Sequence, residues 1–163
     1  FSSTVQGAAA SITFLSVVVG AYLSGHFADK YGRRFPLLIS CFVICIVNLA
    51  SAFSTNIITY TILRSILALC LGFYSPIGFA YILEIMPPSK RGQVVIAGYA
   101  MLFLGELYVC IISLFTFENL DTGNWQALTV WSTVPALLSI FISIPYLDES
   151  VRFLLSSKRY DEA

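Results

Sequence analysis

The sequence predicts an all-α membrane protein with five transmembrane helices, and three observations predict it. First, 58% of the 163 residues are hydrophobic and only 11% are charged, whereas a soluble domain carries about 25% charged residues. Second, residues 4–24 contain no Asp, Glu, Lys, Arg or His, and their length matches the roughly 20 residues that a helix needs to cross a bilayer. Third, short polar connections separate such stretches, so neighbouring spans must run antiparallel.

The expected spans, taken in order, are 4–24, 36–54, 57–83, 93–116 and 127–147, and a cytoplasmic tail covers 148–163. Proline lacks an amide hydrogen, and Pro36 stands at the start of the second span, where that loss costs little. Pro76 lies inside the third span between Gly72 and Gly78. We expect a bend there, with the freed carbonyls satisfied by neighbouring helices.

Small residues recur at every fourth position of two spans, at Ser16, Gly20 and Ser24 in the first and at Ala68 and Gly72 in the third. Burial of apolar area gives no drive for helix association in lipid, and small residues let two backbones approach closely. We interpret both stripes as packing surfaces.

Lysine and arginine are distributed asymmetrically between the connections. Eight of the nine basic residues lie in the first connection, the third connection or the tail, and the ninth, Arg64, lies inside a span. Because cytoplasmic loops are enriched in Lys and Arg, residue 1 is expected on the non-cytoplasmic side and residue 163 in the cytoplasm. This rule does not say which membrane the protein occupies.

Two charged residues fall inside the expected spans, where a charge near the bilayer centre costs at least about 2.5–3.5 kcal/mol. Counted from the outer ends of their spans, Arg64 and Glu106 lie at similar depths, so a contact between them is predicted. Tyr99 shares the helix face of Glu106. In one interpretation Glu106 binds a proton or cation in a polar cavity, with Arg64 as its partner or as a substrate anchor. In the other, equally supported, the pair only holds two helices together.

Charged residues also gather in the connections expected at the cytoplasmic surface. We expect Asp29 to pair with Arg91, and Glu84 to pair with Arg33 or Arg34. Exposed ion pairs contribute only about 0–1 kcal/mol each, which suits a latch that opens and closes. The simpler interpretation is that these charges only set the topology.

The first connection resembles the signature loop of the major facilitator superfamily, which reads G-x-x-x-D-[RK]-x-G-R-[RK]. All specified positions match, at Gly25, Asp29, Lys30, Gly32, Arg33 and Arg34. In that superfamily the loop joins the second and third transmembrane helices on the cytoplasmic side. The position and orientation of the connection in this chain agree with that placement.

Three further stretches resemble sugar porters and organic-ion transporters of this superfamily. The patterns are R-x-x-x-G-x-G-x-G from Arg64, E-x-x-P-x-x-x-R-G from Glu84, and P-E-S-P-R-[WF]-L-L from Asp148. Other residues replace the Gly or Pro of these patterns at Ala68, Cys70, Asp148 and Val151. The second pattern is complete. Gly105 with Glu106, and the stretch Gly123-Asn124-Trp125, resemble the synaptic-vesicle-related and organic-ion branch of the superfamily.

The resemblance implies a cytoplasmic latch formed by Asp29 and Arg91. It also implies that other charged residues surround this latch, beside the motif residues Lys30 and Gly32; they are Arg33, Arg34, Glu84, Glu149 and Arg152. Because the matching helices are the second to the sixth, the chain is expected to be a partial N-terminal six-helix bundle. The first helix and the C-terminal half, which is the expected partner across the substrate site, lie outside it.

The resemblance implies transport of a small polar solute or organic ion by alternating access, as a secondary transporter coupled to protons or sodium. An alternative is a membrane sensor or receptor that keeps the fold without transporting, and a third is a truncated product without activity. The sequence contains no nucleophile elbow, HExxH or P-loop motif, so no enzyme is expected. No catalytic residue, cofactor, metal site or nucleic-acid partner is predicted, and the bilayer is the expected environment.

Overall fold

The computed structural model describes residues 3–117 and 124–149. The elements in chain order are α1 (Ser3–Tyr31), α2 (Arg34–Ala52), α3 (Ile57–Ile85), α4 (Arg91–Thr116) and α5 (Trp125–Tyr146). All five helices are long and apolar enough to cross a membrane. Within the described residues, the predicted fold class of an all-α membrane protein with five spans is therefore confirmed.

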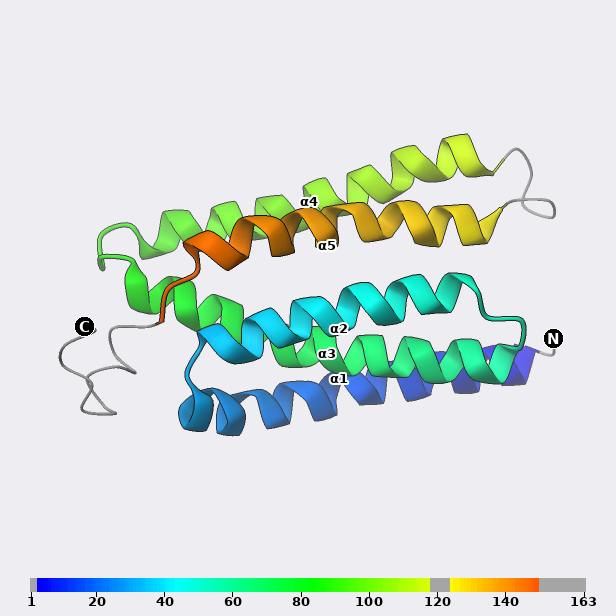
Figure 1. The fold of residues 1–163 in the computed structure, drawn as a ribbon, viewed down its shortest axis with the longest axis horizontal. Helices are drawn as coiled ribbons and strands as arrows, with labels where there is room; N and C mark the ends of the chain where they lie inside the picture. The colour runs from blue at the N-terminus through cyan, green and yellow to red at the C-terminus, as the bar shows by residue number, and fades with distance from the viewer. Residues whose placement is uncertain (1–2, 118–123, 150–163) are drawn as a thin grey trace.

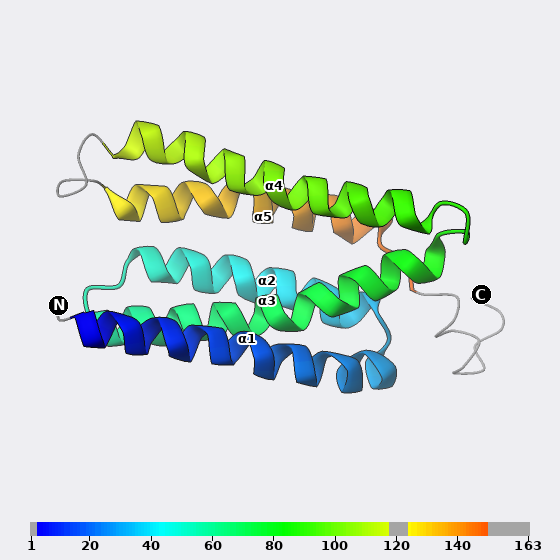
Figure 2. The ribbon, with the colours of Figure 1, turned by 180° about the vertical axis from the view of Figure 1, so that it is seen from behind.

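The helices lie lengthwise in two layers, with α4 and α5 in one and α1, α2 and α3 in the other (Figures 1 and 2). α2 packs against both α3 and α5 and so joins the layers. The α1–α2 connection, the α3–α4 connection and the end of α5 lie at one end of the bundle, and the α2–α3 connection lies at the other. The connections that carry the basic residues are thus gathered at one end.

α1 extends further than the expected span 4–24, because it continues through Asp29 and Lys30 to Tyr31. Its sequence contains no proline, and the helix ends where Gly32 adopts a left-handed φ of 84°. Such a conformation is readily adopted by glycine and is costly for other residues. Most of the motif resembling a signature loop is therefore helical, and only Gly32 and Arg33 separate α1 from α2.

Two asparagines cap helices at the end of the bundle where α3 and α5 begin. The side-chain oxygen of Asn56 accepts a hydrogen bond from the Ile58 amide at 3.1 Å. The side-chain oxygen of Asn124 accepts one from the Ala127 amide at 3.0 Å. Each bond satisfies an amide that the first turn of a helix leaves without a partner.

The closest helix contact joins α1 and α3 through the two predicted stripes of small residues. A Cβ atom added at Gly20 would lie against the backbone of Leu69, and one added at Gly72 would lie against the backbone carbonyl of Val17. These glycines allow the two backbones to touch, as small residues do in membrane helix pairs. The packing interpretation of the stripes is confirmed.

Two small groups of buried apolar side chains lie between the helices. One contains Ala28, Leu37, Ile77 and Tyr81 from α1, α2 and α3. The other contains Cys41 and Cys45 of α2 and Ile140 of α5. Both groups include α2, which agrees with its position between the layers.

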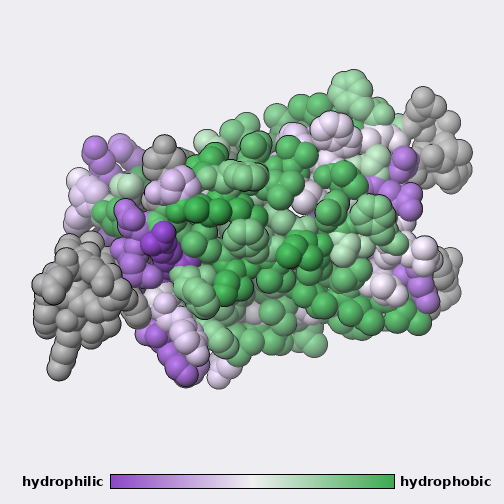
Figure 3. Space-filling view, viewed as in Figure 1, coloured by the Kyte–Doolittle hydropathy of each residue, from purple (hydrophilic) through white to green (hydrophobic). Residues whose placement is uncertain are grey.

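The outer surface is mostly apolar along the helices. Figure 3 shows a broad hydrophobic band along the middle of the bundle, with hydrophilic residues gathered toward its two ends. Within the described residues, α4 contains no buried residue, and side chains such as Leu114 and Phe115 are exposed. A surface of this kind needs lipid or other protein helices around it.

Candidate functional site

Charged side chains meet at the end of the bundle where α1 is joined to α2. One Arg33 Nη atom lies 3.1 Å from Glu84 Oε1 and 3.7 Å from Asp29 Oδ1. The Arg33 and Glu84 side chains are only 18% and 12% exposed, whereas Asp29 is 78% exposed. The sheltered Arg33–Glu84 pair is therefore the stronger of the two, and solvent screens the contact with Asp29. Arg33 was one of the two partners expected for Glu84.

A carboxylate from the far end of the chain caps the start of α2. Glu149 Oε1 accepts hydrogen bonds from the backbone amides of Arg33 at 2.6 Å and Arg34 at 3.3 Å. No side chain at the N-cap position of α2 makes such a bond. The positive end of the helix dipole favours an acidic group there. A Cβ atom at Gly32 would lie 2.7 Å from the Glu149 carboxyl group, so this glycine also leaves room for the carboxylate.

The segment that follows α5 is held at the same end by a second bond. The Tyr81 hydroxyl donates to the carbonyl oxygen of Asp148 at 2.9 Å, and Leu147 packs against the buried group that contains Tyr81. We call Asp29, Arg33, Glu84 and Glu149 the charge network. It links the α1–α2 connection, the end of α3 and the segment after α5.

The predicted Asp29–Arg91 pair is not formed in this structure. Asp29 precedes Arg33 by four residues. Because α1 remains helical through Asp29, this carboxylate faces the Arg33 side chain. Arg91 begins α4, and its Nε atom donates to the Met86 carbonyl oxygen at 3.2 Å. Lys30 is exposed and lies over the Tyr31 ring. Arg152 lies outside the described residues.

A second polar cluster lies inside the bundle, where α2, α3 and α5 meet. Asn48 Nδ2 is within hydrogen-bond distance of Thr133 Oγ1 at 3.0 Å, Ser132 Oγ at 3.1 Å and the Thr129 carbonyl oxygen at 3.4 Å. Arg64 Nη atoms lie 3.4 Å from Asn48 Oδ1 and 3.5 Å from Thr129 Oγ1. We call Asn48, Arg64, Thr129, Ser132 and Thr133 the polar hub.

Arg64 therefore has partners other than the Glu106 predicted for it. Its guanidinium also lies over the Tyr60 ring, 5.0 Å from the centroid, and its Nε atom is buried without a hydrogen-bond partner among the described residues. Glu106 is exposed on α4 and makes no ion pair with Arg64. Their similar depths did not bring the two residues together, because α4 lies beside α5 in the other layer.

Tyr99 lies apart from the polar hub as well. Its ring packs against Phe79 of α3, with 5.4 Å between the ring centroids, and 52% of the residue is exposed. Tyr99 and Glu106 belong to the helix without buried residues, whereas Arg64 belongs to the interior. The structure does not join the three residues into one site.

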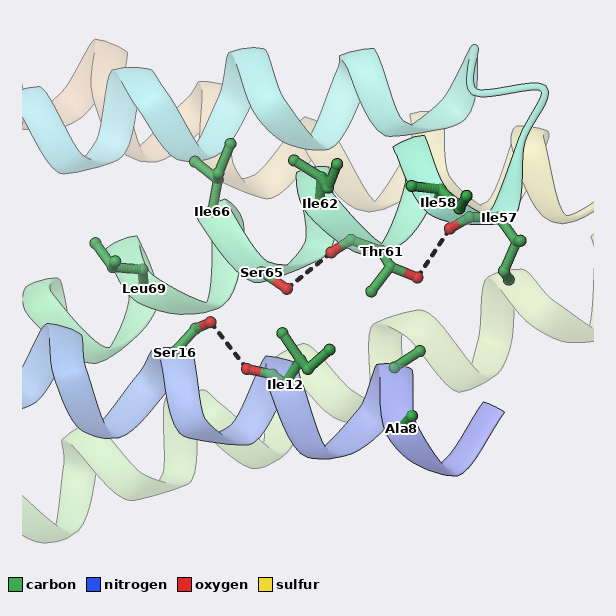
Figure 4. Close-up of a pocket in the computed structure, with 11 residues that line it drawn as sticks. Ala8, Ile12, Ser16, Ile57, Ile58, Thr61, Ile62, Ser65, Ile66 and Leu69 are labelled. Atoms are coloured by element: carbon green, nitrogen blue, oxygen red, sulfur yellow. Dashed lines mark hydrogen bonds between the residues drawn. The ribbon is translucent and has the colours of Figure 1, made fainter. Parts of the chain in front are cut away.

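A groove of about 490 Å³ lies between α1 and α3. Its walls are mainly apolar side chains of isoleucine, alanine and leucine. Figure 4 shows that the hydroxyls of Ser16, Thr61 and Ser65 donate to carbonyl oxygens of their own helices. A neighbouring cavity of about 390 Å³ has a more polar lining than this groove, because Arg64 and Gln6 line it. Of these two spaces, the second is the one that borders the polar hub.

Sequence reasoning missed Asn48 and its hydroxyl partners on α5. The signals were an amide residue inside an apolar span and hydroxyl residues at 129, 132 and 133, which repeat at helical spacing on one face. These signals identify polar faces but do not say which helices meet. The packing of α2 on α5 supplies that information.

A family model described as "Sugar (and other) transporter" matches residues 2–163 of the chain. A D-xylose transporter of Levilactobacillus brevis is 35% identical over 158 residues, which are 97% of this chain and 34% of that protein. An organic cation/carnitine transporter of Arabidopsis thaliana is 31% identical over 158 residues, 96% of this chain and 29% of that protein. The chain thus spans about a third of the length of these curated relatives. Both relatives are transporters and not enzymes.

The fold is similar to solved structures of a major facilitator superfamily member. The proton:xylose symporter XylE bound to 6-bromo-6-deoxy-D-glucose superposes with a TM-score of 0.86 at 23% identity, over 97% of this chain and 38% of that one. An inward-open conformation of XylE from E. coli gives a TM-score of 0.79 over 94% of this chain and 40% of that one. At this identity the similarity concerns the fold.

Proposed function

The chain belongs to the sugar (and other) transporter family, and we propose that the whole protein carries a small polar solute or organic ion across a membrane by alternating access. The observation that carries this proposal is the charge network at one end of the bundle. It joins three separate segments through one arginine and two backbone amides. Such contacts are few, so they can be broken and exchanged, as alternation between two open states requires.

The charge network acts as the cytoplasmic latch in this proposal. The Arg33–Glu84 pair and the Glu149 cap hold the end of the bundle in one arrangement, and their release permits the other. Arg91 and Arg34 lie at the same end and are available as exchange partners, so the expected Asp29–Arg91 pair belongs to a different state of the cycle. The asymmetric distribution of basic residues supports a cytoplasmic location for this end.

The polar residues within the spans supply the proposed route and coupling site. Arg64 borders a cavity of about 390 Å³. Glu106 is an acidic residue on an apolar helix, and a charged group at that depth requires a polar environment. We assign solute contact to Arg64 and, apart from it on α4, to Tyr99, and we assign ion coupling, to protons or sodium, to Glu106. The relatives support solute transport, because one is named for D-xylose and another for organic cations and carnitine.

The route is completed by a second half of the protein in this proposal. Residues 1–163 form part of an N-terminal six-helix bundle, and a C-terminal half covers the opposite wall of the solute site. The exposed apolar faces of α1 and α4 support this arrangement. Residue 1 lies on the non-cytoplasmic side and the segment from 148 to 163 in the cytoplasm.

Uptake by proteoliposomes containing the whole protein tests the proposal. We use radiolabelled D-xylose and carnitine as probe solutes, with and without an imposed proton or sodium gradient. Glu84→Gln removes the sheltered carboxylate that pairs with Arg33 and leaves this arginine with the longer, exposed contact to Asp29. Because a sheltered ion pair is broken, we expect uptake to fall about tenfold. Lys90→Ala is the matched control, since Lys90 is an exposed basic residue at the same end.

The outcomes separate transport from its alternatives. Gradient-driven accumulation of a probe that falls in Glu84→Gln and persists in Lys90→Ala supports the latch. Equal uptake by Glu84→Gln and the wild type contradicts it. Binding of a probe without accumulation would favour a sensor, which the transporter relatives do not favour.

A further inference from the structure

We propose that Asn48 is a positioning residue that fixes the guanidinium of Arg64 at the edge of the solute cavity. This inference rests on the proposed function, and it adds a residue of α2 to a proposed site whose other residues lie on α3 and α4. Asn48 is buried, with 8% of its surface exposed. A buried amide in an apolar span is costly unless its donors and acceptor are satisfied.

In the polar hub, the α5 hydroxyl groups donate to backbone carbonyl oxygens of α5 and accept from side chains of α2 and α3. Ser132 and Thr133 donate their hydroxyl protons to the Thr129 carbonyl oxygen, at 2.7 and 3.0 Å. Thr129 donates its own to the Trp125 carbonyl oxygen at 2.9 Å. The hydroxyl oxygens are therefore left to accept, and they accept from Asn48 and Arg64.

Because the α5 hydroxyl oxygens act as acceptors, they fix the orientation of the Asn48 amide. Its Nδ2 group must face the acceptors on α5, so its Oδ1 atom faces α3 and accepts from Arg64 at 3.4 Å. A flipped amide would place Oδ1 against hydroxyl oxygens that have already used their protons. The α5 hydroxyls thus orient Asn48, and Asn48 in turn orients Arg64.

Arg64 is held on one side and open to a cavity on the other. Asn48 and Thr129 engage its two Nη atoms, and the Tyr60 ring covers the guanidinium. The same arginine, with Tyr60 and Thr61, lines the cavity of about 390 Å³ between α1 and α3. Guanidinium carries five N–H donors. Nε–H is buried and two Nη contacts go to uncharged groups, which leaves the remaining Nη–H donors for a solute or another protein group.

A double-mutant cycle in the whole protein tests whether Asn48 acts through Arg64. Asn48→Leu keeps the size and removes both the donors and the acceptor. Arg64→Lys keeps the charge and removes the planar group that reaches both partners. We expect Asn48→Leu to reduce uptake of the active probe, D-xylose or carnitine, about tenfold, since hydrogen bonds to charged groups are among the stronger ones. In the Arg64→Lys background the same substitution should change uptake less than about twofold.

Ser40→Ala is the matched structural control. Ser40 is a buried polar residue on the same helix, its hydroxyl donates to the Pro36 carbonyl, and it does not contact Arg64. Its effect should be equal in both Arg64 backgrounds. If Asn48→Leu likewise has the same effect in both backgrounds, Asn48 serves only to join helices, and the inference is overturned.

Thermal unfolding of the same variants in detergent keeps the inference separate from the proposed function. Failure of the wild type to transport either probe counts against the proposed function. The double-mutant cycle is then evaluated from melting temperatures. Shifts of Asn48→Leu and Arg64→Lys that are not additive, beside additive shifts for Ser40→Ala, support the positioning of Arg64. Additive shifts for both would refute it without any reference to transport.

Discussion

Replacement of Gly32 by alanine tests the geometry of the charge network most directly. The residue has a φ of 84° and separates α1 from α2. A side chain in the left-handed region costs about 1–3 kcal/mol. The added Cβ atom would also lie 2.7 Å from the Glu149 carboxyl group, so Glu149 must move and weaken its bonds to the amides of Arg33 and Arg34.

The second cost follows from the type of hydrogen bond that is lost. Bonds to a charged group are worth about 1.5–3 kcal/mol each, and water replaces part of this because Glu149 is only half-buried. Together with the backbone cost, we expect Gly32→Ala to destabilise the whole protein by about 2–5 kcal/mol. In a Glu149→Ala background only the backbone cost should remain.

Thermal unfolding of the purified whole protein in detergent measures both quantities. Gly92→Ala is the control, because Gly92 lies at the same end in the first turn of α4 and an added Cβ atom meets nothing within 4 Å. A melting temperature of Gly32→Ala equal to that of Gly92→Ala would refute the argument. An equal loss with and without Glu149 would refute the carboxylate part alone.

Two further predictions concern the helix contact and the coupling site. Gly72→Ala should destabilise the protein by about 1–3 kcal/mol in thermal unfolding, because its Cβ atom meets the Val17 carbonyl and the helices must separate. Gly78→Ala on the same helix should have little effect, since its neighbours lie at 3.9 Å or beyond, and equal losses would contradict the close contact. Glu106→Gln should abolish the gradient dependence of uptake while solute exchange persists; an unchanged response to the imposed gradient excludes the coupling role.

The sequence alone predicted the properties that depend on position along the chain. Hydropathy and length identified the spans, because the bilayer imposes a minimum length on any helix that crosses it. The stripes at Gly20 and Gly72 predicted close packing, since only small residues let backbones touch. The motif around Asp29 and Arg33 indicated the family and where charged side chains would gather.

Only the tertiary structure decided which of these residues meet. Residue counts gave Arg64 and Glu106 similar depths, but α4 lies beside α5 in the bundle, and Arg64 bonds to Asn48 and Thr129. Residue counts give only the depth along the helix axis, whereas a contact also requires that the two helices lie side by side. Likewise, because α1 stays helical to Tyr31, Asp29 faces Arg33 and not Arg91. The cap by Glu149 depends on two segments that are far apart in the chain, and only the packing of the helices brings them together.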